Sequence, residues 1–93
     1  MIPQGTMNSL IRYRDHGYPT GDFLRAVLSN DLMEAIGRAD VNNRIALSEI
    51  CVFVHNEMPS QCHGSRKKYM AWIESMERVE AFMRSWTHSS PIS

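Results

Sequence analysis

The last third of the chain carries apolar residues at a helical spacing, and this pattern restricts the fold more than any other feature. Successive apolar positions are separated mostly by three or four residues, with charged residues between them. This is the period of one helix face, whereas a half-buried strand alternates at every second residue. We expect so large an apolar stripe to be buried, either in the core or against another chain. Its members are Tyr69, Trp72, Ile73, Met76, Val79, Phe82, Met83 and Trp86.

Four helical segments are predicted along the chain: a short one at residues 6–13, then residues 22–38, residues 41–57, and residue 66 to about residue 86. Residues 22–38 and 41–57 are joined so closely that they form either an αα-hairpin or one bent helix. The apolar faces of these two segments are expected to contain Leu24, Val27, Leu28, Leu32, Ala35 and Ile36, widened by Phe23 and Met33, and then Leu47, Ile50, Cys51, Val54 and Met58, flanked by Ile45 and Phe53.

The ends of the segments carry recognisable stop and start signals. Gly17 is a plausible stop for the first helix, and Asp40 and Ser65 are natural caps for the third and fourth. Residues 1–6 and 87–93 are expected to be frayed tails. The sequence therefore predicts one all-α domain over residues 1–93, a small bundle of three main amphipathic helices plus a short N-terminal helix.

Composition excludes several classes of protein. The chain has 93 residues, of which 43% are hydrophobic and 22% charged, which is ordinary for a globular domain. Ten basic and ten acidic residues give a formal net charge of zero. That balance argues against non-specific coating of nucleic acid or anionic membrane, and it leaves little repulsion to oppose self-association.

The expected location is the cytoplasm. No stretch approaches the roughly 20 apolar residues of a membrane span. The N-terminal residues lack the basic and apolar regions of a signal peptide. Two cysteines do not make a disulfide framework, so we expect reduced thiols.

A metal site is weakly suggested by two cysteines and two histidines. Their spacing, C-x3-H-x6-C-H, matches no common zinc finger, and adjacent ligands strain tetrahedral geometry. We therefore expect no metal or other cofactor, and name zinc only as the metal that these residues would suit. They are Cys51, His55, Cys62 and His63.

A catalytic role for Cys62 is also weakly suggested, because it lies shortly before a helix N-terminus and beside His63. Nucleophilic catalysis needs a thiolate, an orienting base and an oxyanion hole placed together. Nothing else in the sequence assembles them. We expect no catalytic residue and no enzymatic activity.

A basic turn at the start of the last helix is a candidate site for an anion or a partner. Three cations there oppose the helix dipole, while free backbone N–H groups favour an anion. The alternative is a solvated turn whose small penalty is tolerated. The residues are Ser65, Arg66, Lys67 and Lys68.

The last helix is also a candidate interface, because its apolar stripe is wider than a small domain needs. Seven methionines add side chains that repack easily, either at a binding surface or in the core. We expect a homodimer that uses Tyr69, Trp72, Phe82 and Trp86.

Parts of the sequence resemble small, uncharacterised helical proteins encoded by bacteriophages and prophages. The matching segments are residues 16–32 (HGYPTGDFLRAVLSNDL), residues 38–40 (RAD), residues 59–65 (PSQCHGS) and Trp72. The resemblance covers roughly residues 11–75. It implies a bacterial cytoplasm and an accessory role in phage–host interplay, but it carries no activity and no catalytic residue.

These observations favour a non-enzymatic phage or prophage accessory protein that binds and modulates a host or phage protein or other macromolecule, in host takeover or counter-defence. The alternative is a small nucleic-acid-binding regulator, with a helix-turn-helix turn near residues 37–40. The predicted recognition helix at residues 41–57 holds only Arg44 as a cation, against Glu49 and Glu57. Binding through the basic turn is not subject to that objection.

Overall fold

Most of the chain is helical, as the apolar periodicity predicts. A computed structural model describes the backbone of residues 1–89 and the side chains of residues 1–84, and no strand occurs in that part of the chain. The all-α prediction is confirmed. The elements are α1 (Gln4–His16), α2 (Asp22–Leu28), α3 (Leu32–Arg38), α4 (Val41–Ile45), α5 (Leu47–Glu57), the 3₁₀ helix η1 (Ser60–Cys62) and α6 (Arg66–Ser89).

The prediction of one continuous helix over residues 22–38 is wrong, because the structure has two helices there, α2 and α3. Asn30 has a positive φ of 64°, a left-handed conformation that asparagine tolerates better than most residues. The side chain of Asp31 then caps α3 by accepting the Glu34 backbone N–H at 3.2 Å. The two short helices pack on each other.

The helix predicted over residues 41–57 is interrupted at Ala46, which separates α4 from α5. The hydrogen bonding of a helix nevertheless continues through this position. The Ala46 N–H donates to the Asn42 carbonyl, and the Ala46 carbonyl accepts from Ile50. The interruption is therefore a bend, and no glycine or proline marks it in the sequence. The predicted bundle of three main helices plus a short N-terminal helix is therefore not confirmed.

The predicted helix boundaries are mostly correct. Gly17 ends α1 in the left-handed conformation, and the side chains of Asp40 and Ser65 accept backbone N–H groups of the helices that follow them. Residues 1–6, expected as a frayed tail, instead contact the body of the molecule. Thr6 Oγ1 donates to Asn43 Oδ1 at 2.6 Å. Of the tail expected at residues 87–93, residues 87–89 belong to α6 and the rest lies outside the described residues.

The core lies where α1, α2, α5 and η1 meet. Its fully buried side chains are Leu10, Tyr13, Leu28, Ile50 and Cys62. Four residues expected in the apolar faces point outward instead: Leu32, Met33, Ile36 and Ile45. None of the helices within residues 1–89 combines the length and apolar content that a membrane crossing requires.

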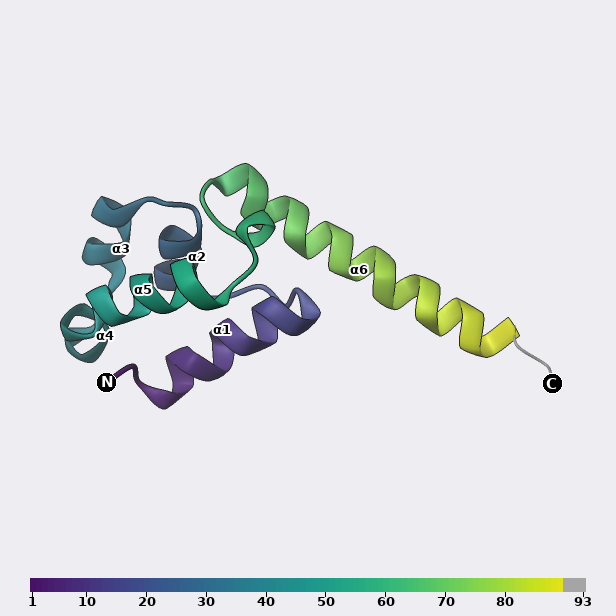
Figure 1. The fold of residues 1–93 in the computed structure, drawn as a ribbon, viewed down its shortest axis with the longest axis horizontal. Helices are drawn as coiled ribbons and strands as arrows, with labels where there is room; N and C mark the ends of the chain where they lie inside the picture. The colour runs from purple at the N-terminus through teal and green to yellow at the C-terminus, as the bar shows by residue number, and fades with distance from the viewer. Residues whose placement is uncertain (90–93) are drawn as a thin grey trace.

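Helix α6 packs on the body through its first half and then leaves it (Figure 1). The rings of Tyr13 and Tyr69 stack with centroids 5.2 Å apart, and Trp72 Nε1 donates to the Tyr13 carbonyl at 2.8 Å. One turn further along, Met76 lies against Gly17 at the end of α1. Beyond that contact α6 projects alone, and the molecule measures 53 × 25 × 21 Å along its principal axes.

Gly17 is the position where the fold most strictly requires a glycine. Its φ is +70°, and a Cβ there would overlap the side chain of Met76. We expect Gly17→Ala to lower the free energy of unfolding by about 2–4 kcal/mol, from left-handed strain and overpacking together.

Gly37→Ala is the matched control, because a Cβ at this helical position meets no atom within 4 Å. It should raise the free energy of unfolding by about 0.5–1 kcal/mol, through the lower backbone entropy of alanine in the unfolded chain. Urea titration followed by circular dichroism measures both. Equal stabilities for the two variants would contradict the close packing of Met76 on Gly17.

Candidate functional site

The most unusual surface of the molecule is the part of α6 that projects beyond the body. We call residues 77–84 the arm. Its apolar side chains are largely open to solvent, with exposures of 53% for Val79, 65% for Phe82 and 56% for Met83. A monomeric protein rarely leaves such residues together on one helix without a use for them. The arm is therefore the first candidate for a binding surface.

The expected interface on α6 needs correction at its N-terminal half. Tyr69 is only 2% exposed, and its hydroxyl accepts the Thr20 backbone N–H at 3.0 Å. Trp72 is partly buried and bonded to Tyr13. Both side chains therefore serve the fold of this chain. Phe82 alone of the predicted set is exposed on the arm, while the side chain of Trp86 lies outside the described residues.

The basic turn does not gather its three cations around one point. Ser65 Oγ accepts the Lys68 backbone N–H at 3.1 Å, so the hydroxyl caps α6. The ammonium group of Lys68 donates to the Ser60 carbonyl at 3.4 Å, and Arg66 lines a hollow beside α2 and α3. Lys67 is exposed. Arg66 and Lys68 point to different neighbours and Lys67 is open to solvent, so the turn offers a partner a general positive potential rather than a formed anion pocket.

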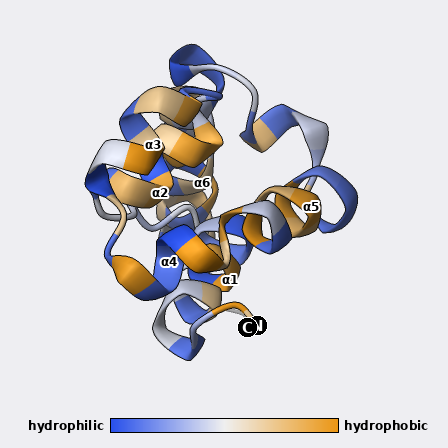
Figure 2. Ribbon diagram, turned by 90° about the vertical axis from the view of Figure 1, so that its left-hand side faces the viewer, coloured by the Kyte–Doolittle hydropathy of each residue, from blue (hydrophilic) through white to orange (hydrophobic). Residues whose placement is uncertain are grey.

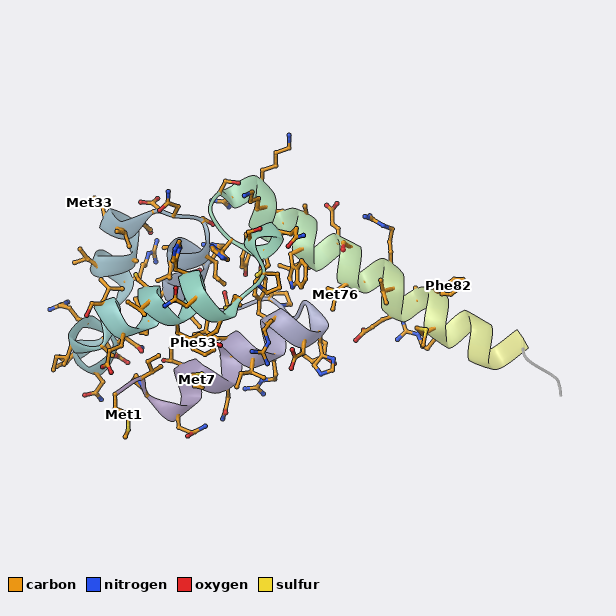
Figure 3. All side chains as sticks on the ribbon, in the orientation of Figure 1. Met1, Met7, Met33, Phe53, Met76 and Phe82 are labelled. Carbon is orange, nitrogen blue, oxygen red and sulfur yellow. The ribbon has the colours of Figure 1, made fainter. Side chains whose placement is uncertain are left out.

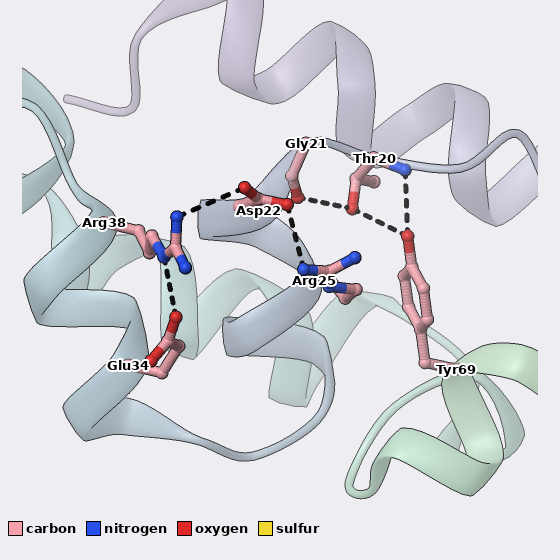
Figure 4. A network of polar contacts seen from close by, with 7 residues as sticks. All are labelled: Thr20, Gly21, Asp22, Arg25, Glu34, Arg38 and Tyr69. Atoms are coloured by element: carbon pink, nitrogen blue, oxygen red, sulfur yellow. Dashed lines mark hydrogen bonds and ion pairs between the residues drawn. The ribbon is translucent and has the colours of Figure 1, made fainter.

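The hollow next to Arg66 has a volume of about 420 Å³ and is lined mainly by charged groups. Figure 4 shows the ion pairs on its wall. Asp22 pairs with Arg25 at 2.9 Å and with Arg38 at 3.4 Å, and Arg38 also pairs with Glu34 at 2.7 Å. These exposed pairs contribute little to stability, each about 0–1 kcal/mol. Because acidic and basic groups balance, the hollow does not select a ligand by charge.

The four candidate zinc ligands are only partly brought together. Cys51, His55 and His63 line one cavity of about 230 Å³ between α2, α5 and the loop before α6. Cys62 is not among its lining residues, and the described residues contain no group of three or more ligating side chains close enough to hold a metal ion. Burial lowers the pKa of His63, and its Nε2 is buried without a hydrogen-bond partner in the described structure.

Cys62 is placed as a core residue. Its side chain is fully buried, and its thiol donates to the Pro59 carbonyl with 3.1 Å between Sγ and O. Burial raises the pKa of this thiol to about 11. Catalysis requires the thiolate, which this environment disfavours at neutral pH. Burial also raises the pKa of the Cys51 thiol, although Cys51 is less buried.

A second apolar surface occupies the other end of the molecule, on α3 and α4. We call it the end face, and it consists of the exposed side chains of Leu32, Met33, Ile36, Val41 and Ile45. Figure 2 views the molecule from this end and shows apolar residues on both helices. Figure 3 shows Met33 and Phe82 projecting at opposite ends. Helical spacing places Leu32 near Ile36 and Val41 near Ile45.

Sequence reasoning did not identify the end face as a surface. It assigned Leu32, Met33 and Ile36 to the buried face of a longer helix, because periodicity shows that a face is apolar but not what covers it. The available signal was the width of that face, which Phe23 and Met33 extend beyond one stripe. Comparison with known protein families, curated proteins and solved structures found no match to this chain.

The two cysteines should differ in reactivity. We expect a thiol reagent such as DTNB to label Cys51 in the folded protein and to label Cys62 only after unfolding in urea, because Cys62 is fully buried. The single-thiol variants Cys51→Ser and Cys62→Ser separate the two reactions. Rapid labelling of Cys62 at pH 8 in the folded Cys51→Ser variant would contradict its burial.

The raised pKa of Cys62 also determines how the stability of the folded protein changes with pH. The folded protein keeps the thiol proton to higher pH than the unfolded chain, whose cysteine has an ordinary pKa of 9.0. The stabilising contribution is complete below pH 9 and is lost as the pH rises from about 9 to about 11. We expect Cys62→Ser to reduce this alkaline loss of stability, measured by urea titration at both ends of the range.

Proposed function

We propose that this chain is a non-enzymatic accessory protein of a phage or prophage, which binds and modulates a host or phage macromolecule in the bacterial cytoplasm. The observation that carries the proposal is the arm of α6, with its three exposed apolar side chains. The sequence resemblance over roughly residues 11–75 supports the phage context. Roles in host takeover or counter-defence fit such a protein.

The energetics of the arm suit reversible binding. Full burial of a large apolar side chain contributes about 1.5–3 kcal/mol, so covering the exposed half of each arm side chain contributes about 1 kcal/mol. Three such residues do not reach the free energy of a tight complex once the cost of association is included. A partner therefore has to use further surface, and the end face and the exposed Lys67 are available for it.

Net charge supports a protein as the partner rather than nucleic acid. The chain has a formal net charge of zero, and Arg66 and Lys68 of the basic turn point to different neighbours. The arm and the end face expose apolar side chains, and such side chains complement apolar surfaces of a protein partner. A complex with nucleic acid needs several phosphate contacts from basic side chains, and its affinity then falls steeply with salt.

The test is affinity capture of the tagged protein from a bacterial lysate, with and without nuclease. We expect a stoichiometric protein to stay bound after nuclease treatment. An arm variant, Val79→Ser with Phe82→Ser, should lose most of that partner because apolar contact area is removed. The matched control is Val52→Ser, which removes an exposed apolar side chain of α5 away from the arm.

The charge of the basic turn is tested in the same experiment. Lys67→Glu is the cleanest change, because Lys67 is exposed whereas Lys68 bonds to Ser60. A full-strength complex with Lys67→Glu would remove the turn from the binding surface. Equal recovery of every protein by wild type and the arm variant would contradict the proposed function, and recovery that vanishes with nuclease would support the nucleic-acid-binding regulator instead.

A further inference from the structure

We infer that the charged hollow beside α2, α3 and the start of α6 binds a small zwitterion, a molecule that carries one carboxylate and one ammonium group, as free amino acids and short peptides do. The hollow contains no residue of the arm or of the end face, so this inference goes beyond the proposed function. Two charged groups without an ion pair and a buried hydroxyl without a partner belong to its lining, and the chain holds them together.

Most charges on the wall of the hollow already neutralise one another. A row of ion pairs runs from Arg25 through Asp22 and Arg38 to Glu34, with paired atoms 2.7–3.4 Å apart (Figure 4). Each carboxylate in this row has a basic partner, and each guanidinium has an acidic one. A ligand therefore gains little by displacing any of these four side chains.

Two charges in the same hollow stand outside this row. The side chain of Arg66 forms no ion pair and no hydrogen bond with the described residues. Asp31 uses Oδ1 to accept the Glu34 backbone N–H at 3.2 Å, and within the described part of the chain it also has no ion pair. The hollow thus offers one unpaired cation and one unpaired anion.

A neutral group without a partner belongs to the same lining. Ser29 lines the hollow, and its Oγ is buried without a hydrogen-bond partner in the described structure. A buried hydroxyl that lacks a hydrogen bond is costly. Because a serine side chain can change its χ1 rotamer, a carboxylate bound beside it can accept the hydroxyl proton. A ligand in the hollow would then supply the missing partner.

The backbone holds these groups on neighbouring segments. The Gly64 N–H donates to the Leu28 carbonyl at 2.8 Å, which fixes the loop before α6 against the end of α2. Arg66 begins α6 two residues after Gly64. The Asp31 N–H donates to the Ala26 carbonyl at 2.8 Å, so the turn between α2 and α3 folds back on the same end of α2. The unpaired cation and anion therefore come from two segments that are both tied to α2.

A zwitterion matches this set of groups better than a ligand with a single charge. The acidic and basic groups of the hollow balance, so a lone anion or cation meets like charges as often as opposite ones. A zwitterion can place its carboxylate on the Arg66 guanidinium, which donates two parallel hydrogen bonds, and its ammonium on the Asp31 carboxylate. The volume of about 420 Å³ lies within the range of about 300–1,000 Å³ that is typical of small-molecule sites.

The first test is a titration of the isotope-labelled full-length protein with glycine and with glycylglycine at neutral pH, followed by two-dimensional NMR. We expect saturable shifts of backbone amide signals from α2, α3 and the first turn of α6. The Kd should be millimolar, because exposed charge contacts are individually weak. Tighter binding of glycine would identify a free amino acid as the ligand, and tighter binding of glycylglycine would identify a short peptide.

Two blocked ligands test the match of charges. N-acetylglycylglycine lacks the ammonium group, and glycylglycinamide lacks the carboxylate. Each should bind several-fold more weakly than glycylglycine, because each leaves one charge of the hollow unpaired. Equal binding of the blocked and unblocked ligands would overturn the inference.

Two variants assign the charges to their residues. Arg66→Gln should abolish the preference for glycylglycine over its amide. Asp31→Asn should abolish the preference over the N-acetyl form, while asparagine still caps α3. Lys67→Gln is the matched control and should bind like wild type, because this neighbouring cation is exposed and does not line the hollow. Ser29→Ala should weaken the binding of glycylglycine several-fold.

The outcomes separate this inference from the proposed function. No saturable shift with either zwitterion, or shifts confined to residues outside the hollow, would overturn the inference. Preferences that persist in both Arg66→Gln and Asp31→Asn, with helical content retained by circular dichroism, would also overturn it. Loss of the captured macromolecule in the arm variant tests the proposed function alone, since the arm shares no residue with the hollow.

Discussion

The arrangement of the molecule depends on the contacts of one residue, Tyr13, in the last turn of α1. Its hydroxyl donates to the Cys62 carbonyl at 2.7 Å, its ring stacks on Tyr69, and its backbone carbonyl accepts from both Gly17 and Trp72. Burial raises the pKa of Tyr13, so the hydroxyl keeps its proton and remains a donor. A buried carbonyl without its partner costs about 1–3 kcal/mol, which makes this link strongly favoured over an open arrangement. Segments nearly sixty residues apart are thereby held in one place.

The direction of α6 follows from that link, and the exposure of the arm follows from the direction. Tyr69 and Trp72 are fixed on the end of α1, while Gly17 lets the chain turn away directly beside Met76. The body is too short to cover the remaining turns of a 24-residue helix. One apolar stripe therefore has two environments, an internal half that stabilises the domain and an external half that is available for binding.

The sequence predicts the helical class and the local boundaries well, because those depend on nearby residues. The periodic stripe, the stop at Gly17 and the caps at Asp40 and Ser65 all act within one or two turns. The break at Asn30 was missed, since the flanking apolar pattern continues through it and a left-handed asparagine is only one of several local options. The division of the α6 stripe at Met76 was equally inaccessible, because it depends on where α1 ends in space. The dispersal of the cations at residues 66–68 depends likewise on Ser60 and on the walls of the charged hollow.

The two exposed apolar surfaces lie at opposite ends of the molecule, with Met33 on the end face and Phe82 on the arm (Figure 3). Two surfaces on one particle bind a target with two sites more tightly than either does alone, provided that the geometry allows both contacts at once. The separation of the two surfaces therefore decides whether one partner can use both.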